Sequence, residues 1–305
     1  MSNKSYEMNV PCPLCKSTEQ ADFPIYYDFN DHLFNGKKCH VCGFIFLSPR
    51  PTEAEITKMY SEEYFTADDA EHGAHSSTDY ETAAILGSVK FPEILGWIQR
   101  YHKTGDFFEI GCGMGYFLKF VRDNGFRASG IEFSSFGTQA AKKKFELNVQ
   151  QGSLDTVSIS PESFDVIFLG DVLEHMVEPI KELQRIYRML RPNGIVAAEV
   201  PSSFNSIIGR AAVLMYNIQG KKRFMKLPPY HVNEFTPPTI KRALEIAGYK
   251  DNLVVERIKK PSTITLRGNM FDKFAKKSIQ YPNYWITKSL GIFGDRILAI
   301  GVKNK

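Results

Sequence analysis

The stretch EIGCGMGYF (Glu109–Phe117) combines an acidic residue, three alternating glycines and the start of an apolar helix pattern. It follows the strand-like run DFFEI and opens the amphipathic segment YFLKFVRDNG, which ends in a glycine stop. Glycines between a strand and a helix let the backbone approach a ligand at the carboxyl edge of an open sheet. This stretch therefore predicts an α/β fold with a nucleotide-like cofactor bound at the loop.

The spacing of the glycines excludes two common nucleotide sites. The dinucleotide fingerprint G-x-G-x-x-G, counted from Gly111, requires a glycine where Tyr116 stands, and no Walker lysine follows the loop. Instead Glu109 precedes the glycines, and Glu132 ends the next strand-like run 21 residues after Gly111. An acid at that place suits two ribose hydroxyls. A cofactor with a ribose and a base but no phosphate fits, and S-adenosylmethionine is such a cofactor.

Strand-like and helix-like segments alternate from about Thr104 onward. The strand-like runs are DFFEI, RASGIEF, a short run near Val149, FDVIFLG and IVAAEV, and a break is expected at RPNG. The helix TPPTIKRALEIAG has Thr236 as its N-cap and Gly248 at its end. This order implies a parallel sheet with helices on both faces. The last runs, NLVVERI and RILAIGV, could pair as an antiparallel edge.

Two Cys-x-x-Cys pairs lie in residues 1–50, with 23 residues between them. Four thiolates complete a tetrahedron around zinc, and a segment with so little core would take its folding energy from the metal. Redox dithiols and a lost metal are the alternatives, and His32 and His40 are not needed as ligands. The expected zinc ligands are Cys12, Cys15, Cys39 and Cys42.

Composition sets loose bounds on the class of protein. A chain of 305 residues with 43% hydrophobic content can bury a full core. The net charge of +4 is too weak to indicate nucleic-acid binding without a local patch. We find no signal peptide and no run of 18 apolar residues, so a cytoplasmic protein without a transmembrane segment is expected.

A helical connector or lid is expected at residues 51–103. Thr52 is a possible cap for EAEITKMY, and a second helical pattern runs through ETAAILGSVKFPEILGWIQRYH. Between them lies a polar loop that contains His72 and His75, which we expect to be solvated. The expected domains are thus the zinc module at 1–50, this connector, and an α/β domain at 104–305.

Residues 104–305 resemble a class I S-adenosylmethionine-dependent methyltransferase. The matching stretches are FEIGCGMGYFL, ASGIEFS, FDVIFLGDVLEHMVEP, ELQRIYRMLRPNGIVAAEVP and HVNEFTPPTIKRALEIAGY. The resemblance implies a Rossmann-like seven-stranded sheet with an antiparallel last strand, and a cofactor lying across the first strands. The cysteine module followed by GFIFLSPRP and MYSEEYF is similar to bacterial methyltransferases of sugar and natural-product pathways.

The family pattern, carried over residue by residue, places the methionine part of the cofactor beside Glu109 and the glycines, and the ribose at Glu132. On the adenine side the family often has an acidic residue after the third strand, where this chain has Ser153 and Leu154. The full set of expected cofactor residues is Glu109, Gly111, Cys112, Gly113, Gly115, Tyr116, Phe117, Glu132, Phe133, Ser153, Leu154, Gly170 and Asp171.

Three polar residues follow the buried run IFLG: Asp171, Glu174 and His175. In this family the loop after the fourth strand lies beside the transferred methyl group. His175 is the expected general base for a hydroxyl acceptor. Alternatively, D-x-x-E-H resembles the ligand set of metal-dependent methyltransferases, and His231 could complete a Mg²⁺ site there. In the third reading, Glu174 and His175 only cap the next helix and brace the sheet edge.

The acceptor is expected to be a small molecule, with a hydroxyl of a sugar, a nucleotide-sugar or a natural-product precursor as the methylated group. Two long insertions, residues 202–231 and 259–295, are expected to cover its pocket. The cluster Lys221, Lys222, Arg223 and Lys226 would contact an anionic acceptor or a membrane surface, or would be a solvated turn. The other functions considered are a nucleic-acid methyltransferase guided by the zinc module and a non-catalytic cofactor-binding protein.

Overall fold

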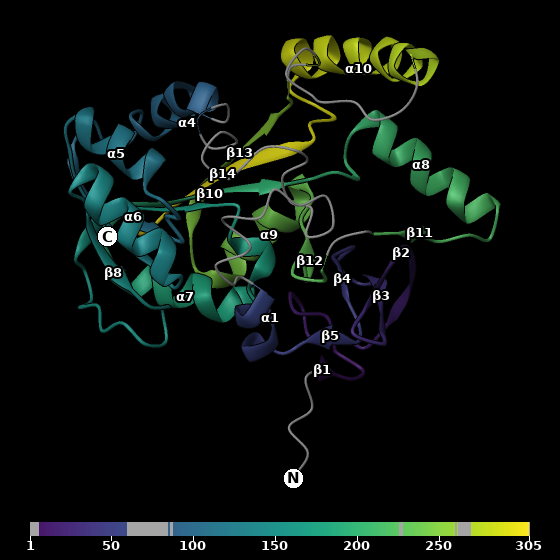
Figure 1. Ribbon diagram of the computed structural model, residues 1–305, viewed down its shortest axis with the longest axis horizontal. Coiled ribbons are helices and arrows are strands. Elements are labelled where there is room, and N and C mark those ends of the chain that lie inside the picture. Colours follow the sequence, from purple (N-terminus) through teal and green to yellow (C-terminus); the bar gives the residue numbers. More distant parts are fainter. Residues whose placement is uncertain are drawn as a thin grey trace.

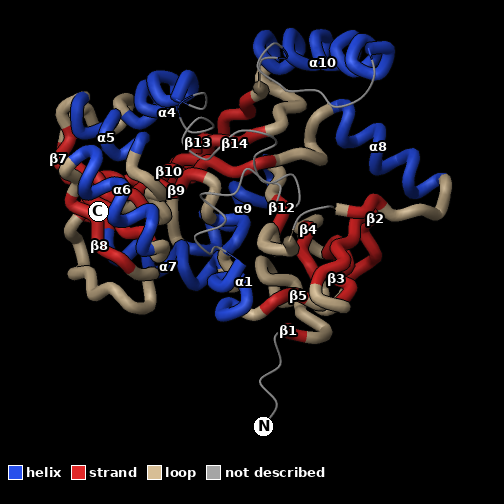
Figure 2. Tube along the Cα trace, in the orientation of Figure 1, coloured by secondary structure: helices blue, strands red, loops and turns tan. Residues whose placement is uncertain are grey.

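The computed structural model describes residues 6–59, 85, 88–225, 228–259, 261 and 270–304. Its largest layer is a twisted sheet with helices on both faces, and a smaller sheet packs beside it (Figures 1 and 2). The sequence predictions for His72, His75 and Lys226 fall outside the described residues.

The large sheet has the predicted seven strands in the order β13-β14-β10-β9-β6-β7-β8 within the described part of the chain. In that order they are Lys250–Arg257, Arg296–Val302, Leu190–Pro201, Phe164–Gly170, Gly105–Ile110, Phe126–Glu132 and Asn148–Gln151. The final strand, β14, is antiparallel to both β10 and β13, while β9, β6, β7 and β8 are parallel to β10. The methyltransferase-like topology and the antiparallel edge are therefore confirmed.

The RPNG segment, which was predicted to be a break before the strand IVAAEV, is part of that strand. It lies within β10, whose pairing with β9 shifts register between Leu190 and Ile195. Asn193 at this place has φ +63°, a conformation that asparagine tolerates. The predicted break is therefore an irregularity inside one strand.

Alternating side chains of the strands pack against two helical layers. The helices are α4 (Phe91–Ile98), α5 (Tyr116–Asp123), α6 (Ser135–Phe145), α7 (Pro179–Met189) and α9 (Pro237–Ala247). In β9, Val166 and Phe168 belong to the cluster with α4, α5 and α6, whereas Ile167 and Leu169 belong to the cluster with α7 and α9. Each such fully buried side chain contributes about 1.5–3 kcal/mol. Burial on both faces explains the uninterrupted apolar run that ends at Gly170.

The smaller sheet joins distant parts of the sequence. Its order is β11-β2-β3-β4-β12 among the described residues. These strands are Arg223–Phe224, Gln20–Phe29, His32–Cys39, Ile45–Leu47 and Asn233–Glu234. Strands β11 and β12 come from the expected α/β domain and pair with β2 and β4 of the cysteine module. The first 50 residues thus share a sheet with the insertion that follows β10.

Buried Arg50 also joins the cysteine module to the segment that precedes the helix Pro179–Met189. It lies in β5 (Arg50–Pro51), which pairs with β1 (Tyr6–Glu7) and precedes α1 (Glu53–Met59). Its Nη1 donates to the carbonyl of Val177 at 2.5 Å, and its Nη2 lies 2.9 Å from a carboxylate oxygen of Glu178. The division into three domains remains a proposal, because the module and the α/β domain share both a sheet and these contacts.

Candidate active site

The glycine loop turns sharply between β6 and α5. Gly111, Gly113 and Gly115 have φ values of +69°, +54° and +81°, which L-residues rarely adopt. A Cβ atom at Gly111 would lie 2.7 Å from Val172 Cγ2, and one at Gly115 would lie 2.5 Å from Leu147 Cδ1. The loop therefore requires glycine for its conformation and for its close packing.

Glu132 and Glu109 lie beside this loop, as predicted. One oxygen of Glu132 accepts from the Gly113 amide at 2.8 Å and the other accepts from the Ser134 amide at 2.9 Å. Glu109 is 5% exposed, and its Oε2 has no hydrogen-bond partner among the described residues. Burial, and then the charge of Glu132, raise the pKa of Glu109 well above its ordinary value. An unpartnered buried carboxyl group suits a cationic ligand group.

Some of the other expected cofactor residues lie at the carboxyl edge of the sheet, whereas others pack in the core. Cys112 and Gly170 lie at the carboxyl ends of β6 and β9, and Ser153 lies just beyond β8. Phe117 instead packs in the core, with its ring centroid 4.6 Å from that of Phe168. Leu154 is likewise part of a buried apolar cluster, which limits what either side chain offers a ligand.

Tyr116 and Phe133 flank the glycine loop and the end of β7. The hydroxyl of Tyr116 accepts from Lys144 Nζ at 2.8 Å, and the half-buried Phe133 directly follows Glu132. Both lie at the edge of the sheet where the resemblance places the cofactor.

Asp171 follows β9 with φ +56° and belongs to a network of charges that the sequence did not reveal. Its carboxylate pairs with Arg296 and lies 3.6 Å from Lys90 Nζ. Desolvation alone would raise the pKa of Asp171, but Arg296 and Lys90 lower it overall. Glu199 is 1% exposed and accepts from Lys90, Arg296 and Arg257. Asp171 is therefore held by cations and does not join its neighbours Glu174 and His175.

Glu174, His175 and His231 come together as a cluster in which Glu174 is buried and the two histidines are partly buried. Each offers one possible ligand atom, and these atoms lie within 4.8 Å of one another. His175 lies in the short helix η2 (Leu173–His175), and its Nδ1 is 2.9 Å from the carbonyl oxygen of Tyr230. Its ring centroid is 4.6 Å from that of His231, and its Nε2 is 3.6 Å from Glu174. The structure thus places His231 next to the motif after β9, although 56 residues separate it from His175.

Burial controls the protonation of the cluster. Glu174 is 1% exposed, neither of its carboxyl oxygens has a hydrogen-bond partner among the described residues, and burial raises its pKa well above the ordinary value. Burial lowers the pKa of His175 to about 4 and that of His231 to about 3. Both imidazoles are therefore neutral at pH 7 and have a lone pair for a proton or a metal ion.

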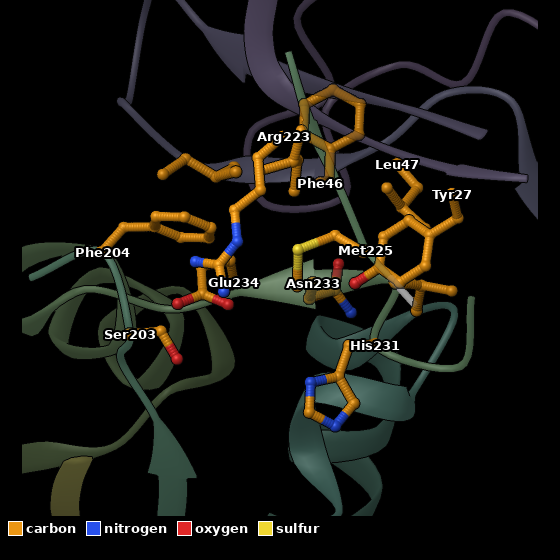
Figure 3. Close-up of a pocket in the computed structure, with 13 residues that line it drawn as sticks. Tyr27, Phe46, Leu47, Ser203, Phe204, Arg223, Met225, His231, Asn233 and Glu234 are labelled. Atoms are coloured by element: carbon orange, nitrogen blue, oxygen red, sulfur yellow. The ribbon is translucent and has the colours of Figure 1, made fainter. Parts of the chain in front are cut away.

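A cavity of about 510 Å³, which includes its opening to solvent, adjoins His231 (Figure 3). The cysteine module supplies one wall, and the insertion after β10 supplies another. The lining residues are Ile25, Tyr27, Ile45, Phe46, Leu47, Ser203, Phe204, Arg223, Met225, His231, Val232, Asn233 and Glu234.

Two acceptor groups of this cavity have no partner within the described chain. Asn233 Nδ2 donates to the Met176 carbonyl at 2.7 Å, whereas its Oδ1 has no hydrogen-bond partner among the described residues. Glu234 Oε1 likewise has no hydrogen-bond partner among the described residues. Figure 3 shows Arg223 pointing toward the carboxyl group of Glu234. Burial raises the pKa of Glu234 to about 8. The cavity therefore offers apolar walls and a few polar groups that can accept hydrogen bonds.

The four predicted cysteine ligands lie together in the module. Cys12 Sγ is 3.5 Å from Cys42 Sγ, and Cys15 Sγ is 3.6 Å from Cys39 Sγ. All four sulfur atoms lie within 4.8 Å of one another. A tetrahedral zinc ion with Zn–S bonds of about 2.3 Å requires separations of this size, so the residues fit the metal.

Comparison with known proteins assigns the family. A family profile described as a methyltransferase domain matches residues 91–254, which is more than half of the chain. A probable S-adenosylmethionine-dependent methyltransferase of Mycolicibacterium smegmatis is 23% identical over 48% of this chain and 52% of its own length. A ubiquinone biosynthesis O-methyltransferase of Aeromonas salmonicida is 31% identical over 52% of this chain and 69% of its own. The chain thus spans about half to two thirds of such relatives.

Solved structures agree on the fold. A possible histamine N-methyltransferase from Thermotoga maritima has a TM-score of 0.51 at 19% identity, covering 74% of this chain and 95% of its own. A phosphoethanolamine N-methyltransferase from Haemonchus contortus has a TM-score of 0.52 at 14% identity, covering 86% of this chain and 63% of its own. These matches show the fold alone, whereas the profile that covers more than half of the chain shows that it belongs to the methyltransferase domain family.

Proposed function

We propose that this protein transfers the methyl group of S-adenosylmethionine to a hydroxyl group of a small molecule bound in the cavity of Figure 3. The observation that carries the proposal is the position of His231, which belongs both to the cluster after β9 and to the lining of the cavity. An acceptor there would lie between the glycine loop's sheet edge and the cysteine module.

The residues beside the glycine loop fit the cofactor. The unpartnered carboxyl oxygen of Glu109 suits the ammonium group of the methionine part, and Glu132 suits the ribose hydroxyls. When bound, S-adenosylmethionine supplies an electrophilic methyl group on a sulfonium ion. Tyr116, Phe133 and Ser153 remain proposed cofactor contacts, with Ser153 on the adenine side.

His175 is the proposed general base. Its Nδ1 faces the Tyr230 carbonyl, which favours the proton of the neutral ring on Nδ1, and Nε2 is the proposed proton acceptor. An acceptor hydroxyl that takes up this methyl group would have to lose its proton. The hydroxyl proton passes to His175 Nε2, a transfer that typically contributes about 10²–10⁴-fold to the rate. Asp171 is proposed to fix the loop through Arg296 rather than to react.

A divalent ion at the same cluster is the second candidate. One carboxyl group and two neutral imidazoles, from Glu174, His175 and His231, fit such an ion, and a cation would give the buried Glu174 a partner. Two nitrogen donors suit zinc or iron better than the Mg²⁺ expected from the sequence, because Mg²⁺ prefers oxygen ligands. Such an ion would orient the acceptor oxygen and favour its deprotonation.

The relatives support oxygen as the methylated atom. They include ubiquinone biosynthesis O-methyltransferases and a malonyl-[acyl-carrier protein] O-methyltransferase of Serratia marcescens, which is 23% identical over 63% of this chain. The many apolar residues around the cavity favour an acceptor with a ring or chain that carries a hydroxyl group. The sugar acceptor stays a prediction, as does a zinc ion bound to the four cysteines.

Methyl transfer can be tested by mass spectrometry with isotope-labelled S-adenosylmethionine and two acceptor sets, phenols with catechols and nucleotide-sugars. We expect a labelled product whose formation falls by at least about 10²-fold in His175→Ala, with little change in affinity for the demethylated cofactor. His102→Ala is the matched control, because His102 contacts Asn193 at the opposite edge of the sheet.

The same assay separates the two roles of the cluster. If His175 is the base, a chelator weak enough to leave zinc on the four cysteines, as checked by elemental analysis, leaves turnover unchanged. If the cluster binds an ion, the same chelator abolishes turnover, iron(II) restores it, and His231→Ala reproduces the loss. Unchanged turnover in both histidine variants would contradict the proposed site and assign the cluster a structural role.

A further inference from the structure

Helix α8 (Ile207–Ile218) has an unusual distribution of side chains. None of its residues is buried, although the sequence IIGRAAVLMYNI is mostly apolar. Leu214, Met215 and Ile218 are 60%, 58% and 76% exposed, and with Ile208 and Ala211 they recur at the three- and four-residue intervals of one helix face. An amphipathic helix of a folded core turns this face inward. Here the apolar face is turned to solvent.

Helix α10 (Met270–Leu290) extends this apolar area. Asn283 Oδ1 accepts from the Ile207 amide at 3.3 Å, and Arg210 lies 5.2 Å from the ring centroid of Phe293. Both helices lie at the outer edge of the molecule, at the upper right of Figure 1. We name the α8–α10 surface by its exposed apolar side chains: Ile208, Leu214, Met215, Ile218, Phe224, Tyr281, Trp285, Leu290 and Ile292.

Exposed apolar side chains are not spread evenly over the molecular surface. Sixteen large apolar side chains of the described residues are exposed, and nine of them belong to the α8–α10 surface. The others come from separate places, such as Leu33 in the cysteine module and Ile246 in α9. Isolated exposed apolar residues are normal, whereas a group of this kind indicates an interaction site.

The charges of this surface favour one occupant. The sequence contains no Asp or Glu from 203 to 225 or from 278 to 294. Lys222 pairs with Asp22, and the charge of exposed Lys288 acts on Glu93, but exposed Lys221 forms no ion pair with any described residue. A symmetric dimer would bring these cations together, whereas anionic lipid headgroups would complement them. Exposed Trp285 and Tyr281 are of the types enriched at the interface between membrane and water.

We propose that the α8–α10 surface adsorbs to membranes that contain anionic phospholipids. Among the described residues no helix is long and apolar enough to cross a bilayer, so the protein lies on the membrane through this part. The apolar face of α8 enters the boundary between headgroups and acyl chains, and the lysines contact phosphate groups.

Flotation of the full chain with lipid vesicles tests this proposal without any need for the methyl acceptor. The vesicles contain phosphatidylcholine alone or mixed in equal parts with phosphatidylglycerol. We expect the protein to float with the mixed vesicles and much less with phosphatidylcholine alone. Leu214→Ser with Ile218→Ser should weaken binding at least about tenfold, because two apolar side chains no longer leave water. Lys221→Glu should lower the preference for the mixed vesicles.

Ile246→Ser is the matched control, because Ile246 is exposed on α9 outside the surface. It should float as the wild type does, and thermal unfolding should confirm that all variants are folded. Absence of the wild type from the floating fraction would overturn the proposal, as would undiminished binding of the Leu214/Ile218 variant. A stable dimer in light scattering that this variant dissociates would instead assign the surface to a second copy of the chain.

Discussion

Glu174 and Glu234 are the two residues whose surroundings most directly indicate ligands. Both have carboxyl oxygens without a hydrogen-bond partner among the described residues, and burial raises the pKa of each. A buried polar group without a partner costs roughly 1–3 kcal/mol, which a folded protein retains when a ligand or reaction uses the group. One lies in the histidine cluster and the other lines the adjoining cavity, which agrees with a single site for the acceptor.

The pKa of Glu234 predicts a pH-dependent contribution to stability. Burial raises this pKa from 4.5 to about 8, so in this window the folded state binds a proton that the unfolded state releases. The contribution of Glu234 to the free energy of unfolding therefore decreases as the pH rises through the window. Glu234→Gln removes this dependence. The variant should gain stability over the wild type as the pH approaches 8 and differ little near pH 4.5.

Urea denaturation across this pH range measures the difference. Glu245→Gln on α9, where the side chain is exposed, is the control and should follow the wild type at every pH. Parallel stability curves for Glu234→Gln and the wild type would contradict the protonation assigned to this residue.

The sequence predicted the residues of the site that lie within single motifs. The glycine loop follows β6, Glu132 ends β7 and the sequence DVLEH follows β9, so the parallel order of these strands places them at the same edge. Lys90, Arg296 and the partners of Asp171 could not be predicted in this way, because they reach the edge from other parts of the chain. His231 was identified by resemblance, and only the fold explains why it lies next to His175.

At the scale of elements, the short strand β12 connects the cysteine module to the candidate active site. Asn233 and Glu234 pair with Phe46 and Ile45 of β4, and His231 precedes this strand by two residues. Asn233 also donates to the Met176 carbonyl, just beyond η2. The module therefore helps to hold His231 against His175. Two-residue strands have no periodicity, which is why the sequence did not reveal β11 or β12.

This pairing predicts how loss of metal would spread through the molecule. Elemental analysis should find one zinc ion per chain, and a chelator should increase amide hydrogen exchange in β3, β4 and β12. Exchange in β6, β7 and β9 should remain slow, because the face of the large sheet that packs against α4, α5 and α6 has a core without any residue of the module.

Two results would contradict this account of the module. One is absence of zinc from freshly reduced protein. The other is faster exchange throughout both sheets, which would indicate that the large sheet depends on the metal for its fold.

At the scale of the whole molecule, three surfaces have different proposed partners. The carboxyl edge of the large sheet faces the proposed cofactor, the cavity beside the module faces the proposed acceptor, and the α8–α10 surface faces the proposed membrane. The insertion after β10 takes part in the last two, because it contributes Ser203, Phe204 and Arg223 to the cavity and α8 to the exposed surface. The order of strands and helices was predictable from apolar periodicity, whereas this sharing of one insertion depends on tertiary packing.

Calorimetry with S-adenosylhomocysteine, the demethylated cofactor, tests the central claim most directly, since it requires no acceptor. The wild type should bind with a micromolar dissociation constant, and His175→Ala should bind as tightly. Glu132→Ala should bind about ten- to a hundredfold more weakly, because it removes charge-assisted hydrogen bonds to the ribose, while Glu245→Ala should match the wild type. Absence of binding by the wild type, or equal affinity of Glu132→Ala, would contradict the assignment of this edge as a cofactor site.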